Sequence, residues 1–297
     1  MPSAYRNSFT LFRISALSIY FISISLCSSE FTNDFRAFLH NRYGLAVVNQ
    51  LERRDLGADA SLGGRNGDDP FLHEAVIIVH GITNKITRFN ITIKQFLFLL
   101  ENNEILFFIC TKWNRFDLGV TPAGLVEMKC AYVKQIRSMI IAVREYTGRK
   151  VDIVGYSMGS PLARKAILGG NCVDTREVLG PPLTEHIDTF LSVAGANYGS
   201  SLCIVPIPLG TCNKRNGLHC ESEFLSDINA QMRYEAEHIF SIFSTSDEKV
   251  GFRTCSRLAS PIVGQNGYVK KSGYMHDDVL DKTLDIQINF ITKHKPR

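Results

Sequence analysis

The sequence predicts an α/β fold in which helices cover both faces of a mostly parallel sheet. Short apolar runs without polar alternation recur along the chain, as expected for strands buried on both faces. Stretches with apolar residues at helical spacing lie between these runs. Alternation of this kind builds a parallel sheet, and functional groups then gather at the carboxyl ends of its strands.

The apolar runs mark the expected strands. The first reads Ala-Val-Ile-Ile-Val at 75–79 and ends at His80-Gly81, and a second covers 105–109. Three more strands are expected at 151–156, 189–194 and 239–243. Each run has the length and the composition of a buried strand.

Helices are expected between and around these strands. Phe31, Phe35, Phe38 and Leu39 fall on one helical face, and Gly44 is a natural end for that helix. Further helices are expected at 125–146 (ended by Gly148), at 161–168 and at 279–291. A loop rich in Gly, Asp and Asn is expected at 55–69.

Residues 1–29 have the character of a secretory signal peptide. Arg6 and Arg13 precede an uncharged apolar run at 14–27, and two small residues, Ser28-Ser29, follow it. The run is shorter than the roughly 20 residues that a membrane-spanning helix needs, and no later stretch is long and apolar enough. A membrane anchor is the weaker alternative, so we expect residues 30–297 to be exported as a single domain.

Charge and sequence motifs restrict the classes of partner. The formal net charge of +4 falls to +2 without Arg6 and Arg13, and the remaining charges are scattered, so no nucleic-acid partner is expected. The cluster at Lys270-Lys271 is expected to be a solvated face. Asn90-Ile91-Thr92 is a candidate glycosylation site that could equally lie unmodified in a helix.

Cysteine usage predicts disulfides. Of the eight cysteines, Cys27 leaves with the signal, and in an oxidising compartment most of the other seven should pair. Because seven is odd, one thiol is free, two chains are joined, or cleavage occurs elsewhere. Cys203, Cys212 and Cys220 lack the close spacing of a structural zinc site, so disulfides are favoured over zinc.

The sequence Gly155-Tyr156-Ser157-Met158-Gly159 ends the expected strand at 151–156. A G-x-S-x-G pattern arises by chance in about one chain in ten of this length, so its setting matters more. A buried strand precedes it, a helix opening at Pro161 follows it, and the glycines permit a tight turn. This strand-turn-helix elbow predicts an α/β-hydrolase with Ser157 as nucleophile; the alternative is a tight turn with an ordinary surface serine.

A serine hydroxyl needs a base, which in this fold follows the serine and an acid in sequence. Five histidines follow Ser157: His186, His219, His238, His276 and His294. His186 and His238 lie before strands. His219 lies in the cysteine-rich region, and His294 lies in the basic tail. His276, in the loop before the last expected helix, is therefore the expected base.

Asp247 is the expected acid, because it lies shortly after the strand at 239–243. Its role would be to hold the imidazole tautomer and to stabilise the imidazolium. Glu248 is expected to point away and to be solvated. Asp277 and Asp278 adjoin His276 too closely to orient it from behind.

The oxyanion of an ester intermediate needs backbone N–H donors. We expect these from Met158, directly after the nucleophile, and from Ile82, in the loop after the first strand. His80 precedes Ser157 in sequence, so it is expected to pack and shape that loop rather than act as base.

Several segments resemble the class 2 lipase family: 79–84, 151–161 with 164–166, 193–197, 244–251 and 274–278. This family comprises secreted α/β-hydrolases, numerous in nematodes and similar to small bacterial triacylglycerol lipases. The resemblance implies hydrolysis of acyl-lipid esters at a lipid–water interface, with Ser157, Asp247 and His276 as the triad. Lys112 to Phe116 departs from the family pattern, where a smaller, Gly-rich loop is expected. The resemblance therefore does not predict the shape of the pocket.

Two alternatives remain: an esterase for short soluble esters, and an inactive hydrolase that binds a lipid or a protein. The second predicts a broken triad, whereas all three residues are present. No motif calls for a nucleotide, flavin or metal, so no cofactor is expected. The segment 198–225 is either a disulfide-pinned flap over the pocket or an ordinary surface loop.

Overall fold

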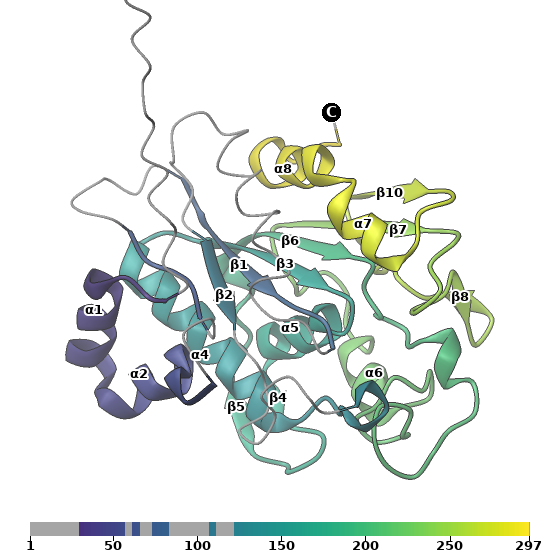
Figure 1. Cartoon of the computed structure of the whole chain (residues 1–297), viewed down its shortest axis with the longest axis horizontal. Helices are drawn as coiled ribbons and strands as arrows, with labels where there is room; N and C mark the ends of the chain where they lie inside the picture. The colour runs from purple at the N-terminus through teal and green to yellow at the C-terminus, as the bar shows by residue number, and fades with distance from the viewer. Residues whose placement is uncertain (1–29, 57–60, 66–72, 83–106, 111–121, 297) are drawn as a thin grey trace, which may run out of the picture.

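The computed structural model describes residues 30–56, 61–65, 73–82, 107–110 and 122–296. Within these residues a six-stranded sheet has the order β10-β7-β6-β3-β1-β2. Every neighbouring pair is parallel, and helices cover both faces (Figure 1). The expected α/β fold is therefore confirmed.

The sheet strands are β1 (Ala75–Val79), β2 (Phe107–Cys110), β3 (Val151–Tyr156), β6 (Ile187–Val193), β7 (His238–Ser244) and β10 (Gly267–Lys271). Four of them begin and end within two residues of the expected bounds. Positions 105 and 106 of the second expected strand lie outside the described residues. Strand β10 is not among the expected strands, because its edge position leaves alternate residues exposed and the sequence there is not an apolar run.

Four short strands form two separate antiparallel pairs. They are β4 (Gly170–Asn171) with β5 (Val178–Gly180), and β8 (Arg253–Thr254) with β9 (Arg257–Leu258).

The helices divide between the two faces of the sheet. One face carries α1 (Asn33–Tyr43), α2 (Leu45–Glu52), α4 (Cys130–Thr147), α5 (Gly159–Leu168) and α6 (Glu223–Ile228). The other carries α7 (His276–Asp281) and α8 (Leu284–Lys293) (Figure 1). Successive strand residues point to opposite faces of the sheet. Ile77 packs in the apolar core on the face that carries α1 to α6, and Val76 and Ile78 pack in the core on the face that carries α7 and α8.

Two helix expectations need correction. The helix expected at 279–291 is two helices, because the buried Thr283 bonds its hydroxyl to the Val279 carbonyl and lies at the break between them. The helix expected from 125 begins at Cys130, since Ala123–Leu125 forms a separate 3₁₀ turn. Gly44 does end α1, with φ 83°, and α2 begins immediately after it.

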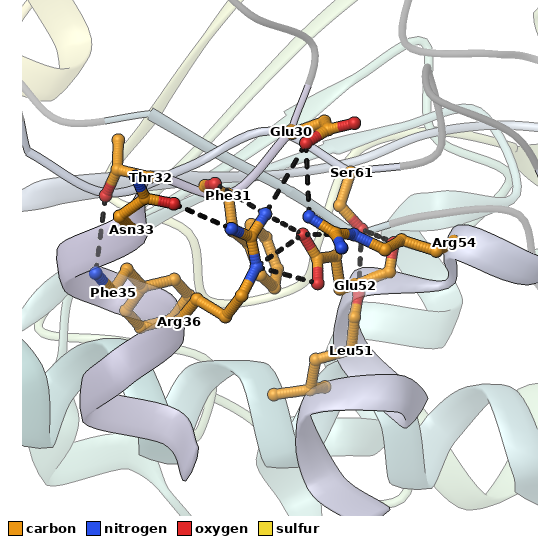
Figure 2. Close-up of polar contacts among 10 residues, drawn as sticks. All are labelled: Glu30, Phe31, Thr32, Asn33, Phe35, Arg36, Leu51, Glu52, Arg54 and Ser61. Atoms are coloured by element: carbon orange, nitrogen blue, oxygen red, sulfur yellow. Dashed lines mark hydrogen bonds and ion pairs between the residues drawn. The ribbon is translucent and has the colours of Figure 1, made fainter. Parts of the chain in front are cut away.

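A charged cluster joins α1 to the end of α2. Figure 2 shows the guanidinium of Arg36 between the carboxylates of Glu30 and Glu52. The Arg36 Nε lies 3.0 Å from Glu52 Oε1, and Arg54 adds a second contact to each carboxylate. Because the Glu52 side chain is only 4% exposed, its charge requires these cationic partners. The cluster thus fixes the helical pair that precedes β1.

Three disulfides are present: Cys130–Cys172, Cys203–Cys212 and Cys220–Cys255. Cys203–Cys212 closes a loop within the connection after β6, and Cys220–Cys255 ties that connection to the β8–β9 hairpin. The expectation that most of the cysteines pair in disulfides is confirmed. The side chain of Cys110, the seventh cysteine, lies outside the described residues, as do Asn90 and the segment 112–116. Among the described helices, none combines the length and the apolar character needed to cross a bilayer.

Candidate active site

Ser157 occupies the turn between β3 and α5. Its φ of 56° is in the left-handed region, which is strained for a residue with a side chain. Its N–H donates to the Val193 carbonyl at 3.0 Å, and its carbonyl accepts from the N–H groups of Ser160 and Ala196, both at 3.2 Å. These bonds hold the strained residue at the carboxyl end of the sheet.

Glycines on either side permit this turn to pack tightly. A Cβ at Gly155 would collide with the backbone of Ser160, and a Cβ at Gly159 would collide with the carbonyl oxygens of Val79 and His80. The first turn of α5 therefore lies directly against the end of β1, where the loop after that strand begins.

Asp247 and His276 meet at the same edge. His276 is the first residue of α7, and its Nδ1 lies 2.8 Å from Asp247 Oδ2. The two side chains are only 3% and 2% exposed, and low solvent access strengthens such a contact. Asp247 Oδ1 accepts from the N–H groups of Lys249 and Val250 at 3.0 and 2.8 Å, which fixes the carboxylate. The Nε2 of the imidazole is thereby directed away from the acid.

Tyr156 connects the elbow to the histidine. The rings of Tyr156 and His276 lie 5.1 Å apart between centroids, and the Tyr156 hydroxyl donates to Asp277 Oδ1 at 2.6 Å. Asp277 also binds Lys249 Nζ at 3.0 Å. Burial alone would raise the pKa of Asp277, but the hydrogen bonds from Tyr156 and Lys249 outweigh it, so the pKa is lowered. An ionised Asp277 thus helps to hold Tyr156 beside the His276 ring.

Glu248 is exposed, as expected, but it does not point away from the histidine. Its Oε2 accepts a hydrogen bond of 2.8 Å from the backbone N–H of His276. That N–H lies in the first turn of α7 and has no acceptor within the helix, so a carboxylate is favoured there. The two residues are 28 positions apart, so no local sequence pattern reveals this contact. Consecutive carboxylates therefore hold the ring and the backbone of one histidine.

The candidate oxyanion donors lie on two loops at this edge. Met158 is buried and is the N-cap residue of α5, where free N–H groups and the helix dipole favour negative charge. Ile82 is half-buried and packs against the core, at the last described position after β1. His80 is also buried, with Nδ1 2.8 Å from the Gly81 carbonyl, in keeping with a packing position.

Buried polar residues form a hydrogen-bond network around Ser160, in the first turn of α5. Ser160 Oγ lies 2.8 Å from Asn197 Oδ1 and 2.9 Å from Ser192 Oγ. The Asn197 side-chain amide donates to the Ser260 carbonyl at 2.6 Å, and the Asn197 backbone carbonyl accepts from the Asn229 side-chain amide. None of these residues is an expected site residue; Asn197, in the segment 193–197 that resembles the class 2 lipase family, was the available signal.

Two other histidines, His238 and His294, lie together away from this site. The rings of His238 and His294 stack with centroids 3.7 Å apart, and His294 Nε2 lies 2.9 Å from Asp188 Oδ2. Ligand atoms of these three residues lie within 4.8 Å of one another, so the group could hold a metal ion. It lies near the amino ends of β6 and β7, at the opposite edge from Ser157, and so forms no part of this site.

Known proteins agree with this architecture. A family model described as Lipase (class 2) matches residues 73–289. The chain is similar to Aspergillus fumigatus lipase B, with TM-score 0.53 and 14% identity over 75% of this chain and 53% of that one. It is also similar to the mature lipase BlEst2 of Bacillus licheniformis, with TM-score 0.53 and 12% identity over 77% and 96%.

These structural likenesses, at such low identity, show the fold alone, and the chain spans about half the length of the Aspergillus lipase. A comparison with curated proteins finds no match. The family match, however, covers most of the chain and contains the elbow, the acid and the histidine. The chain therefore belongs to the class 2 lipase family.

Proposed function

We propose that the protein hydrolyses carboxylic esters of acyl lipids such as triacylglycerols through an acyl-enzyme on Ser157. The observation that carries the proposal is the buried pair of Asp247 and His276, at the sheet edge where the strained elbow holds Ser157. A buried acid–histidine contact beside a strained serine is the arrangement that ester hydrolysis by a triad requires.

In the first half of the reaction, the Ser157 hydroxyl attacks the ester carbonyl carbon while His276 Nε2 accepts the hydroxyl proton. Asp247 stabilises the imidazolium, and the N–H groups of Met158 and Ile82 bind the oxyanion. His276 then gives the proton to the departing alcohol. In the second half, His276 activates water, which releases the fatty acid and regenerates the serine.

We further propose that residues 1–29 direct export and that residues 30–297 work as one secreted domain. The three disulfides support this, because disulfides persist in oxidising compartments. The basic and apolar order of the leader supports it as well.

The test is hydrolysis of p-nitrophenyl butyrate and palmitate by the secreted protein and its Ser157→Ala variant. We expect the variant to lose about 10³-fold or more of the activity, because the nucleophile is removed. Ser226→Ala, an exposed serine on α6, is the matched control and should keep full activity. The butyrate-to-palmitate ratio separates a lipase from a short-ester enzyme. No turnover by folded protein with intact disulfides contradicts the proposal.

A further inference from the structure

The segment from Leu202 to Leu209 is apolar and yet exposed. It reads Leu-Cys-Ile-Val-Pro-Ile-Pro-Leu, without a charged, amide or hydroxyl side chain. Four of its residues are 67% to 74% exposed: Leu202, Ile204, Val205 and Leu209. A run of exposed apolar side chains of this kind marks contact with a partner or a lipid phase. We refer to residues 202–209 as the apolar loop.

The protein holds the apolar loop in place. The Cys203–Cys212 disulfide closes it, and the N–H of Thr211 donates to the Gly124 carbonyl at 3.0 Å. This contact sets the loop beside Leu125, which is itself 61% exposed and enlarges the apolar surface. The exposed side chains are thus presented outward by a pinned backbone.

The base of the apolar loop lies beside the candidate active site. The N–H of Ser201 donates to the Val250 carbonyl at 2.8 Å, and the N–H of Val250 in turn binds Asp247. In Figure 1 the connection between β6 and α6 extends from the side to which the strand arrows of β3 and β6 point. A surface bound by the loop therefore lies at the edge of the sheet that carries Ser157.

Part of the backbone of the apolar loop suits a lipid phase. An N–H group without an acceptor is costly in lipid, because no water is present to accept its hydrogen bond. Pro206 and Pro208 have no N–H. The N–H groups of Leu202 and Ile207 donate inside the protein, at 3.1 and 3.3 Å. Insertion of the loop therefore leaves these four positions without an unpaired donor.

We propose that the apolar loop inserts into the surface of aggregated acyl lipid and anchors the active-site edge there. The inference rests on the proposed function, since it assigns the physical form of that substrate. The disulfide makes the loop a fixed anchor rather than a hinged cover. Because residues 202–209 carry no charge, attachment depends on buried apolar area and is insensitive to salt.

The binding test uses the Ser157→Ala protein, so that lipid is not consumed, and vesicles of dioleoylphosphatidylcholine in a co-sedimentation assay. Val205→Ser/Leu209→Ser should weaken binding by about 10- to 100-fold, because two side chains no longer enter the lipid. The matched control is Leu45→Ser/Val178→Ser, on α2 and β5, whose side chains are 60% and 78% exposed. This control should bind as the parent does.

The catalytic test places the same double substitutions in the wild-type background. The loop variant should keep its turnover of dissolved p-nitrophenyl butyrate and lose turnover of emulsified triolein. Equal vesicle binding by the loop and control variants overturns the proposal, as does release by raised salt. A dimer that the loop substitutions convert to a monomer, without vesicle binding, assigns the loop to a second copy and also overturns it. Loop-dependent binding without butyrate turnover refutes the proposed function and leaves the docking proposal standing.

Discussion

The Nδ1 of His276 lies 2.8 Å from Oδ2 of Asp247, although 29 positions separate them in the sequence. They meet because β7 and β10 are adjacent parallel strands, with Ser244 paired to Lys271 at their carboxyl ends. Asp247 follows the first strand by three residues and His276 follows the second by five. Both loops therefore leave the sheet at the edge where β3 delivers Ser157.

This contact predicts a large effect of Asp247→Asn. The amide keeps the shape of the side chain but removes the charge that stabilises the imidazolium and favours the wrong tautomer. We expect kcat on p-nitrophenyl butyrate to fall by about 10³- to 10⁴-fold, with an unchanged circular dichroism spectrum.

The chain supplies a matched control for that variant. Asp188 contacts a histidine in the same way, at 2.9 Å from His294, but at the opposite edge of the sheet. Asp188→Asn should leave kcat within about twofold of wild type, as a change remote from the reacting atoms. Equal losses from Asp247→Asn and Asp188→Asn contradict a specific role for Asp247.

Glu248 is predicted to position His276 through its backbone N–H. Glu248→Ala should lower kcat by about tenfold with little change in KM, since loss of this anchor loosens the base without touching the substrate. Glu248→Gln retains an acceptor oxygen and should restore most of the rate. A glutamine variant as slow as the alanine variant argues against the hydrogen bond as the cause.

Gly159→Ala tests the packing beneath the elbow. The new Cβ would collide with the carbonyl oxygens of Val79 and His80, which are backbone atoms and cannot move aside easily. We expect a loss of about 1–3 kcal/mol in the free energy of unfolding, measured by urea titration. Gly124→Ala, where the added Cβ has nothing within 4 Å, should change stability little. Similar losses in both variants contradict this close approach.

Asp277 predicts a dependence of stability on pH. Its pKa is lowered in the folded protein, so its contribution is present above the unfolded pKa of about 3.9 and is lost as pH falls through the folded value. Asp277→Asn should therefore cost stability at neutral pH and progressively less on acidification. The contribution is modest because the group is largely solvent-screened. Urea unfolding of both proteins across this pH range checks it, and a constant difference between them contradicts it.

The sequence predicts the centre of the sheet better than the edge formed by β10. Strands β1 and β3 are buried on both faces, so their residues form continuous apolar runs that are visible without a structure. Strand β10 reads Gly-Tyr-Val-Lys-Lys and alternates between half-buried and exposed positions at the sheet edge. Its strand character comes from pairing with β7, which the local sequence does not reveal.

The same distinction applies to the site. Ser157 lies in a local motif, and Asp247 could be chosen because it follows a predictable strand. The contact of Glu248 with the His276 backbone depends on the register of β7 with β10, so no local pattern announces it. The catalytic roles of Ser157, Asp247 and His276 stay a prediction.

The central claim is that Ser157 is the nucleophile, and covalent labelling tests it most directly. The protein is treated with a p-nitrophenyl alkylphosphonate, and the modified peptide is identified by mass spectrometry. We expect one equivalent of p-nitrophenol to be released per protein, the adduct to lie on Ser157, and neither to occur in Ser157→Ala or in unfolded protein. An adduct on another residue, or no adduct on folded protein with intact disulfides, contradicts the account.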